Sequence, residues 1–256
     1  PFFGEVEVVV NDTSLLMYSG NDDLVAMTFF WYGNSSFERF STAIWLKLCK
    51  VSNTIFDVGS HSGLYSLLAA KKNPCAEIVS FEPSRRTHGR LLLNSFINKL
   101  ENRIKAECSA ICDKVGTTKF LQFRNNNILG VGGSILSKDI PVTDDSEIIN
   151  TVTLDHYCEK NKFAPDLIKI DVEGAEVLLI KGGGNSIKKF EPIMLIEITP
   201  KTSFEMFEKL NSFGYCMVEI DEYLGSYKKF YGKVDEVKNI LAIPSSSYEN
   251  IKSLIW

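Results

Sequence analysis

The sequence predicts a doubly wound α/β fold, in which helices cover both faces of a mostly parallel β-sheet. From residue 54 onward, short apolar runs alternate with amphipathic segments of helical length. Two of these runs, 166–171 (DLIKID) and 192–198 (PIMLIEI), are apolar almost throughout, as expected of central parallel strands buried on both faces. At 56–66 (FDVGSHSGLYS) an apolar run gives way to two glycines and then to a helical pattern.

The other elements of the predicted domain follow from the same two periodicities. Amphipathic segments indicate helices at 37–50, 64–72, 84–99 and 203–213, and apolar runs indicate further strands at 54–58, 76–82, 104–110, 117–123, 215–220 and 237–243. The segment 124–146 is polar, contains Gly132, Gly133 and Ser134, and is long for a loop of a compact domain. This segment either covers the molecule on which the protein acts or is a loop that extends over the surface.

Residues 1–34 are expected to form an antiparallel extension in front of the main domain, which covers residues 35–256. The extension contains three apolar runs, at 5–10, 14–19 and 23–31, which we interpret as strands joined by turns rich in Asn, Asp, Ser and Gly. About thirty residues cannot build a core of their own, so we do not expect a separate domain there.

The overall composition narrows the classes of protein and partner. A net charge of -4 argues against a nucleic-acid-binding protein, because phosphate recognition usually requires a surplus of basic residues. The chain has no apolar run of the 18 or so residues that a membrane span needs. The six cysteines lack the spacing of a zinc site and are expected to be reduced thiols, so a cytoplasmic location is predicted.

The glycine-containing loop after the first sheet strand is a candidate cofactor site. Asp57, Gly59 and Gly63 form D-x-G-x-x-x-G, which differs from the G-x-G-x-x-G loop that binds the pyrophosphate of dinucleotides. A carboxylate in front of the loop would repel phosphate and suits a cationic ligand such as S-adenosylmethionine. The alternative is a strand-to-helix turn that requires glycine only for its backbone conformation.

Three further acidic positions stand at strand ends. Glu82 follows Asp57 by 25 residues, where a doubly wound fold places an acid that binds ribose hydroxyls, unless it is merely exposed. Lys169, Asp171 and Glu173 alternate and so share one side of their strand, and Glu197 ends the next strand. The cluster suits an ion pair, a proton acceptor or oxygen ligands for a divalent cation. Four strands would then contribute carboxylates to one crevice.

These residues and motifs resemble those of the FkbM-type S-adenosylmethionine-dependent methyltransferases. The resemblance rests on 56–66, on FEP at 81–83, on Asn94 and Asn98 in the next helix, and most specifically on DLIKIDVEGAE at 166–176. Further matches are Phe37–Glu38, Ser109–Ala110, GGS at 132–134, TLD at 153–155 and IMLIEI at 193–198. The resemblance implies a seven-stranded class I methyltransferase fold, S-adenosylmethionine as methyl donor, and in several members a hydroxyl acceptor on a sugar or natural product.

The resemblance also implies roles for individual residues. The loop from Asp57 to Gly63, with Gly59, Ser60 and His61, would hold the methionine end of the cofactor. Glu82 would bind the ribose, Ser109 and Ala110 would lie beside the adenine, and Asp171 and Glu173 would lie where the methyl group meets the acceptor. The sequence departs from the family pattern at Ser60-His61-Ser62, where Ala-Asn is usual. His61 would accept a proton there or replace the hydrogen bonds of the amide.

The predicted reaction is methyl transfer to a hydroxyl of a small molecule or glycan. We expect Asp171 to act as the base, with Glu173 or His61 as substitutes and Lys169 holding the carboxylate in place. A divalent cation bound by Asp171, Glu173 and Glu197 is the less favoured alternative, and no metal site is assigned. A noncatalytic binding module on the same fold and, less favoured, a nicotinamide-dependent oxidoreductase are the competing functions.

Overall fold

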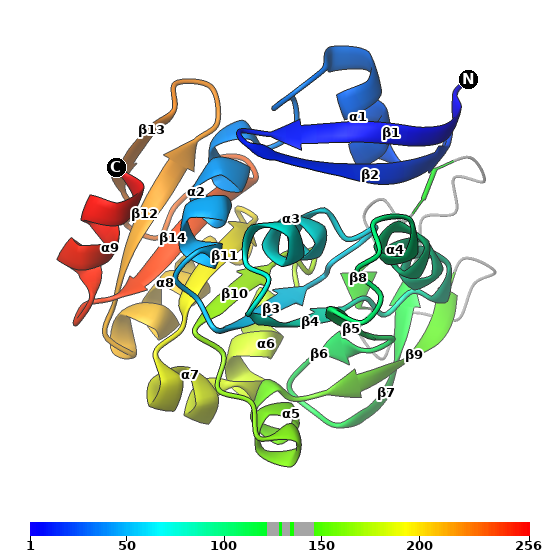
Figure 1. The fold of residues 1–256 in the computed structure, drawn as a ribbon. Helices are drawn as coiled ribbons and strands as arrows, with labels where there is room; N and C mark the ends of the chain where they lie inside the picture. The colour runs from blue at the N-terminus through cyan, green and yellow to red at the C-terminus, as the bar shows by residue number, and fades with distance from the viewer. Residues whose placement is uncertain (122–127, 130–133, 136–145) are drawn as a thin grey trace.

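A computed structural model describes residues 1–121, 128–129, 134–135 and 146–256, and it confirms the doubly wound α/β fold. Its central sheet has the strand order β13-β12-β14-β11-β10-β3-β4-β5, with β14 antiparallel to both of its neighbours and the hairpin strand β13 at one edge (Figure 1). Without β13, seven strands remain, which is the predicted number. The strands are β3 (Thr54–Val58), β4 (Glu77–Phe81), β5 (Ile104–Glu107), β10 (Leu167–Ile170), β11 (Ile193–Ile198), β12 (Tyr215–Asp221), β13 (Ser226–Lys229) and β14 (Lys238–Pro244).

Helices cover both faces of this sheet, as the apolar character of its central strands requires. Every residue of β3 and β10 is buried, and two separate apolar cores lie on opposite faces. One face carries α2 (Arg39–Cys49), α3 (Leu64–Lys72) and α4 (Arg85–Ile97), and the other carries α5 (Leu154–Asn161), α6 (Glu176–Gly182), α7 (Gly184–Phe190) and α8 (Ser203–Ser212) (Figure 1). The C-terminal helix α9 (Tyr248–Ile255) packs on α2 and β14.

The N-terminal extension contains the antiparallel hairpin that was predicted, but the prediction of a third strand is wrong. β1 (Phe3–Val10) pairs with β2 (Thr13–Gly20), and residues 24–32 form helix α1 (Leu24–Tyr32). Asp23 caps this helix, because its Oδ1 accepts hydrogen bonds from the amides of Val25 and Ala26, at 3.0 and 3.2 Å. The run is apolar without alternation, so it lacks the period of a half-buried strand, and the capping aspartate decides for a helix.

The hairpin packs on the helices α2, α3 and α4 and is tied to α4 by side-chain hydrogen bonds. Val8, Val10 and Met17 are fully buried in the same apolar core as residues of α2 and α3. Asn94 of α4 and Asn98, the residue that follows its last turn, bind the backbone of β2. The extension therefore shares its core with the rest of the chain.

A small second sheet lies beside the main one and has the order β6-β9-β7-β8 among the described residues. Its strands are β6 (Ala110–Ile111), β7 (Gly116–Leu121), β8 (Ser134–Ile135) and β9 (Ser146–Val152). The expected strand 104–110 is thus divided between two sheets, and β9 was not predicted. Most of the predicted loop 124–146, including Gly132 and Gly133, lies outside the described residues, whereas Ser134 pairs with Leu121 in β8.

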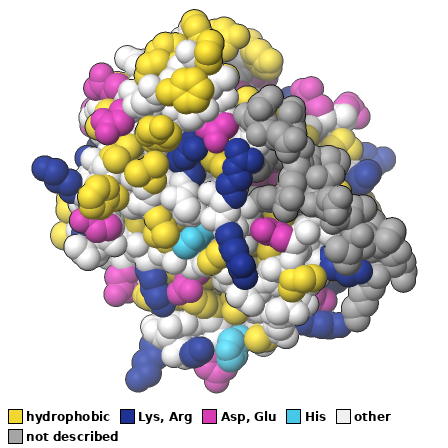
Figure 2. All heavy atoms as spheres, turned by 90° about the vertical axis from the view of Figure 1, so that its right-hand side faces the viewer, with side chains coloured by type: hydrophobic (Ala, Val, Ile, Leu, Met, Phe, Trp, Pro, Cys, Tyr) yellow, Lys and Arg dark blue, Asp and Glu magenta, His cyan; other side chains and the backbone are white. Residues whose placement is uncertain are grey.

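Charged side chains are spread over much of the surface, and exposed apolar side chains gather around the N-terminal hairpin. In Figure 2, apolar atoms gather at the top of the molecule, where Figure 1 places β1, β2 and α1. Phe3, Trp31 and Tyr32 are all more than half exposed there. None of the helices in the described ranges combines the length and the apolar character needed to cross a bilayer.

Candidate functional site

The carboxyl ends of the central strands surround a cavity of about 290 Å³. The four acids that the sequence placed at strand ends all line it, with Asp57 from β3, Glu82 after β4, Asp171 after β10 and Glu197 from β11. Because parallel strands end at the same edge of a sheet, residues far apart in the sequence meet here. Apolar side chains of Val58, Phe81, Ile111, Phe120 and Val172 complete much of the wall.

The loop after β3 runs so close to neighbouring backbone that glycine is required in it. Gly59 has φ +80°, and a Cβ there would lie 1.6 Å from the carbonyl oxygen of Asp171. Gly63 has φ +97°, and a Cβ there would lie 2.5 Å from Leu91. The amides of Gly59 and Ser60 donate to the carbonyl of Phe81, at 2.9 and 3.0 Å. These contacts join the loop to the strands on both sides of β3.

Glu82 is buried and holds the loop by its carboxylate. One oxygen accepts from the amide of His61 at 3.0 Å, and the other accepts from the amide of Ser84 at 2.9 Å. Burial raises the pKa of Glu82 to about 7, although the His61 charge and the two amides oppose the shift. Each oxygen keeps a second lone pair, so the carboxylate can also accept hydrogen bonds from a ligand in the cavity.

Asp57 is fully buried and is held by α3. Its Oδ2 accepts a hydrogen bond from Ser66 Oγ at 2.5 Å, and Ser66 Oγ lies 2.5 Å from Ser80 Oγ. Burial raises the pKa of Asp57 to about 6, while the Ser66 hydrogen bond and the charge of Lys169 oppose this. Asp57 thus contributes negative charge from beneath the loop.

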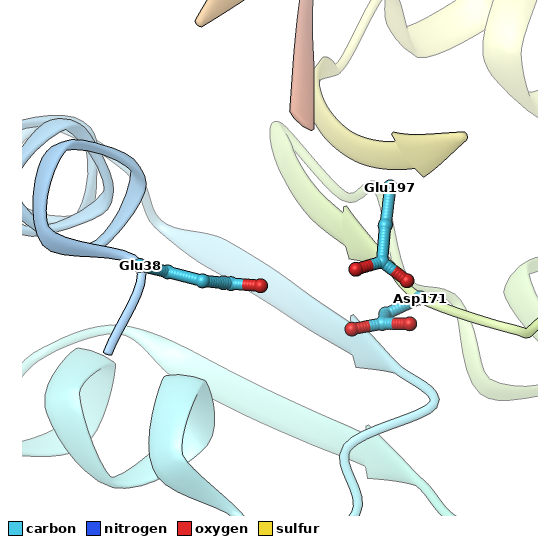
Figure 3. A group of neighbouring side chains, drawn as sticks. All are labelled: Glu38, Asp171 and Glu197. Atoms are coloured by element: carbon cyan, nitrogen blue, oxygen red, sulfur yellow. The ribbon is translucent and has the colours of Figure 1, made fainter. Parts of the chain in front are cut away.

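Lys169, Asp171, Glu197 and Glu38 meet at one end of the cavity. The ammonium group of Lys169 is buried, lies 3.5 Å from Asp171 Oδ2 and stands 5.0 Å from the centre of the Tyr65 ring. Carboxylate oxygens of Glu38, Asp171 and Glu197 lie within 4.8 Å of one another. Figure 3 shows the Asp171 and Glu197 carboxylates facing each other, with Glu38 approaching from the start of α2. The hydroxyl of Tyr65 donates to Glu38.

The charges of this group are strongly coupled. Burial lowers the pKa of Lys169, but the negative charge of Asp171 and, after it, that of Glu38 oppose burial, so the net pKa is raised and the amine stays protonated. Burial and the neighbouring Asp171 raise the pKa of Glu197 to about 9. Glu197 is therefore protonated at neutral pH and donates a hydrogen bond to Asp171.

The structure places the other predicted site residues in different surroundings. His61 lines the cavity with φ +50°, its Nε2 lies 3.0 Å from the carbonyl of Leu129 and its Nδ1 lies 3.2 Å from Ser62 Oγ. Since a carbonyl only accepts, Nε2 is the donor, and both ring nitrogens are engaged. Glu173 lines the cavity from an exposed turn with φ +50°. Ala110 lines the cavity, and its buried neighbour Ser109 is not among the described residues that do.

Glu38 and Tyr65 are site residues to which the sequence gave no role. Glu38 belongs to the lead-in segment that supports the family resemblance, but it precedes Asp57 by 19 positions and only the tertiary structure brings it to the cavity. The less favoured alternative from the sequence was a divalent cation bound by Asp171, Glu173 and Glu197. In the structure Glu38 takes the place of Glu173, since the carboxylates that lie together are those of Glu38, Asp171 and Glu197. Lys169 already supplies positive charge to that group, and the cation stays the less favoured prediction.

The cavity fits S-adenosylmethionine better than a dinucleotide. Among the described lining residues the basic ones are Lys169 and His61, and Lys169 is paired with carboxylates, so little positive charge is available for a pyrophosphate. The carboxylates and apolar walls suit a ligand that carries a sulfonium and an ammonium group on an apolar nucleoside. Ser60 Oγ is buried in the loop and has no hydrogen-bond partner within the described part of the chain, which leaves it available to such a ligand.

Comparisons with known proteins agree with this geometry. The model of the methyltransferase FkbM domain matches residues 57–224. Methyltransferase sdnD from Sordaria araneosa is 27% identical over 154 residues, which are 50% of this chain and 59% of the relative. Hexuronic acid methyltransferase AglP from Haloferax volcanii is 26% identical over 157 residues, which are 60% of this chain and 59% of the relative. The matches thus span less than two thirds of these relatives.

A solved structure supports the fold independently. The S-adenosylmethionine-dependent methyltransferase from Agrobacterium tumefaciens superposes with a TM-score of 0.53 at 11% identity, over 96% of this chain and 72% of that chain. At this identity the likeness concerns the fold alone, and the fold is that of class I methyltransferases.

Proposed function

The chain belongs to the FkbM methyltransferase family, and from this premise we propose that it transfers the methyl group of S-adenosylmethionine to a hydroxyl of a sugar, a glycan or a secondary metabolite. S-adenosylmethionine is the cofactor that the family and the fold imply. The observation that carries the proposal is the cavity in which Asp57, Glu82, Asp171 and Glu197 meet at the end of the sheet. In this proposal Glu82 binds the ribose, and the loop from Asp57 to Gly63 holds the methionine end.

The chemistry that the cofactor supplies is an electrophilic methyl group on a positively charged sulfur. The chain's own residues must then orient the acceptor and take its proton. We assign the base to Asp171, because it is partly exposed to the cavity and is held by Lys169 and Glu197. His61 is a weaker candidate, since its Nε2 donates to Leu129, and Glu173 stands on a turn without comparable support.

The acceptor class is supported by the lining of the cavity. Carboxylates accept hydrogen bonds from several hydroxyls at once, so the group of Glu38, Asp171 and Glu197 suits a polyhydroxylated molecule. The name of AglP states a hexuronic acid as its substrate, which is also a sugar derivative. A noncatalytic binding module is the competing function. Its distinguishing feature would be binding of S-adenosylmethionine without transfer to any acceptor.

Isothermal titration calorimetry with S-adenosylmethionine, S-adenosylhomocysteine and NAD tests the cofactor. We expect both sulfur ligands to bind and NAD to give no heat of binding. Ala in place of Asp57 should weaken binding of both sulfur ligands, since it removes charge beneath the loop. NAD binding without binding of a sulfur ligand would reject the proposal.

Substitution of Asp171 by Asn tests the base. With a panel of free sugars and methyl glycosides as acceptors, release of S-adenosylhomocysteine should fall by about 10²- to 10⁴-fold, the usual contribution of a general base. Binding of S-adenosylhomocysteine should stay within about twofold of the parent, because the change is isosteric. Full activity of D171N would show that another residue takes the proton of the acceptor.

A further inference from the structure

The first turn of α2 is capped by a side chain from the far end of the chain. Glu38 is the N-cap residue of this helix, and its carbonyl accepts from the amide of Thr42 at 2.8 Å, but its side chain makes no capping hydrogen bond. The free amides of Phe40 and Ser41 donate instead to the carboxylate of Glu222, at 2.8 and 3.1 Å. The hydroxyl of Ser41 donates to the same carboxylate. Glu222 thus supplies the acceptor that an N-cap side chain normally provides.

The turn between β12 and β13 is built to bring Glu222 to this position. Asp221 Oδ1 accepts from the amides of Tyr223 and Leu224, both at 2.9 Å, which fixes the turn around Glu222. Gly225 has φ +64°, and a Cβ there would lie 2.2 Å from the ring of Phe40. Only glycine allows the turn to lie this close to the start of α2.

Because Glu222 caps α2, the carboxylate of Glu38 is free to lie in the cavity. It accepts from the hydroxyl of Tyr65 and lies within 4.8 Å of the Asp171 and Glu197 carboxylate oxygens (Figure 3). Glu38 also holds a left-handed backbone conformation, φ +41°, which is unfavourable for a residue with a Cβ and needs support from its surroundings.

We propose that Glu222 is a positioning residue, which keeps the carboxylate of Glu38 in the cavity by taking over the capping of α2. Without Glu222, the amides of Phe40 and Ser41 would lack an acceptor at the positive end of a helix. The carboxylate of Glu38, which belongs to the N-cap residue itself, is the acceptor nearest along the chain. It would turn back to cap its own helix and leave Tyr65. The functional consequence rests on the proposed function, in which Glu38 contacts the acceptor.

A double-mutant cycle between the two glutamates tests the proposal. Glu222→Ala should lower kcat/KM for methyl transfer by about 10- to 100-fold, the loss expected when a site group is displaced. In a Glu38→Gln background, the same change should lower kcat/KM by less than about twofold, because the positioned group is already gone. Glu222→Gln should restore part of the activity, since its amide oxygen can still accept from one of the α2 amides.

Asp155 provides a matched control for loss of a cap. Its carboxylate accepts from the amides of Asn185 and Ser186 at the start of α7, at 3.2 and 2.7 Å, and it does not line the cavity. Asp155→Ala should lower the midpoint of thermal unfolding by about 2–4 °C, as should Glu222→Ala. It should leave kcat/KM unchanged. Equal losses of activity in E222A and D155A would reduce Glu222 to a structural cap and overturn the proposal.

A crystal structure of the E222A protein decides the question without an activity assay. The proposal expects the Glu38 carboxylate on the amides of Phe40 and Ser41, and the Tyr65 hydroxyl released from it. Glu38 unchanged against Tyr65 would overturn the proposal, as would equal effects of E222A in both backgrounds of the cycle. If the parent protein binds no sulfur ligand, the proposed function fails, and this structure still tests the positioning role.

Discussion

At the scale of single residues, the site is defined by buried carboxyl groups that differ in protonation. Burial raises the pKa values of Asp57, Glu82 and Glu197 to about 6, 7 and 9. Among the described residues that line the cavity, only Lys169 offers a permanent positive charge close to Asp171 and Glu197. At neutral pH Glu197 is protonated and donates a hydrogen bond to Asp171, the residue that we propose as the base.

The raised pKa of Glu82 predicts a pH-dependent stability. Its ordinary value is 4.5 and its value in the fold is about 7, so the folded protein binds the extra proton between these pH values. The free energy of unfolding should therefore fall as pH rises from about 4.5 to about 7, by on the order of 3 kcal/mol for this group. Urea unfolding from pH 5 to pH 8 measures it, and Glu82→Gln should remove this part of the slope.

Glu77→Gln is the control for this measurement, because Glu77 is exposed at the start of the same strand. The variant should keep the parent's pH profile. For Glu82→Gln only the slope of the stability profile against pH is informative. The glutamine has one oxygen in place of the two that accept from backbone amides, so the variant is also less stable at every pH. Parallel profiles of E82Q and the parent would show that Glu82 ionises as it does in the unfolded chain.

At the scale of elements, α4 connects the N-terminal hairpin to the loop after β3 through one buried asparagine. Asn94 Oδ1 accepts from the amide of Tyr18, and Asn94 Nδ2 donates to the carbonyl of Ser62, both at 2.8 Å. Asn98, one turn later, binds both the amide and the carbonyl of Leu16, at 2.9 and 2.6 Å. These side chains bind backbone groups along one edge of β2, which makes that edge less open to pairing with a strand of another chain.

The two asparagines form a matched pair for a ligand-binding experiment. Each alanine substitution should lower the free energy of unfolding by about 2–4 kcal/mol, because buried backbone groups lose their partners. Asn94→Ala should in addition weaken S-adenosylhomocysteine binding by about tenfold, since it releases the Ser62 carbonyl and the loop. Asn98→Ala should change binding by less than about twofold. Equal affinities of both variants for the ligand would show that the hairpin and the loop are not coupled.

At the scale of the whole molecule, the hairpin and the sheet domain share one core. Fully burying Val8, Val10 and Met17 contributes on the order of 5 kcal/mol, which is comparable to the whole stability of a typical domain. We therefore expect that a chain without residues 1–34 will not fold stably. Circular dichroism and thermal unfolding of residues 35–256, beside the full chain, measure this. A cooperative transition at the parent's midpoint would show that the extension is dispensable.

The sequence by itself determined the sheet and the positions of its acids. Continuous apolar runs can only be buried between two helical layers, and parallel strands bring their carboxyl ends to one edge. Asp57, Glu82, Asp171 and Glu197 therefore met as predicted. The roles given to them, and to Lys169, Glu173, His61, Ser109 and Ala110, stay predictions, as do the division at residue 34 and the cytoplasmic location.

Only the tertiary structure decided which residues from outside the strands reach the site. Glu38 enters because Glu222, 184 positions later, caps α2 in its place, and no local pattern encodes a contact over that distance. The contact of His61 Nε2 with the carbonyl of Leu129 and the division of 104–110 between two sheets are equally nonlocal. At 24–32, in contrast, the missed helix carried a local signal, the capping Asp23. The period of a strand is encoded by neighbouring residues, whereas a helix cap from a remote turn, or carboxyl groups gathered from several elements, arise only when distant segments pack together.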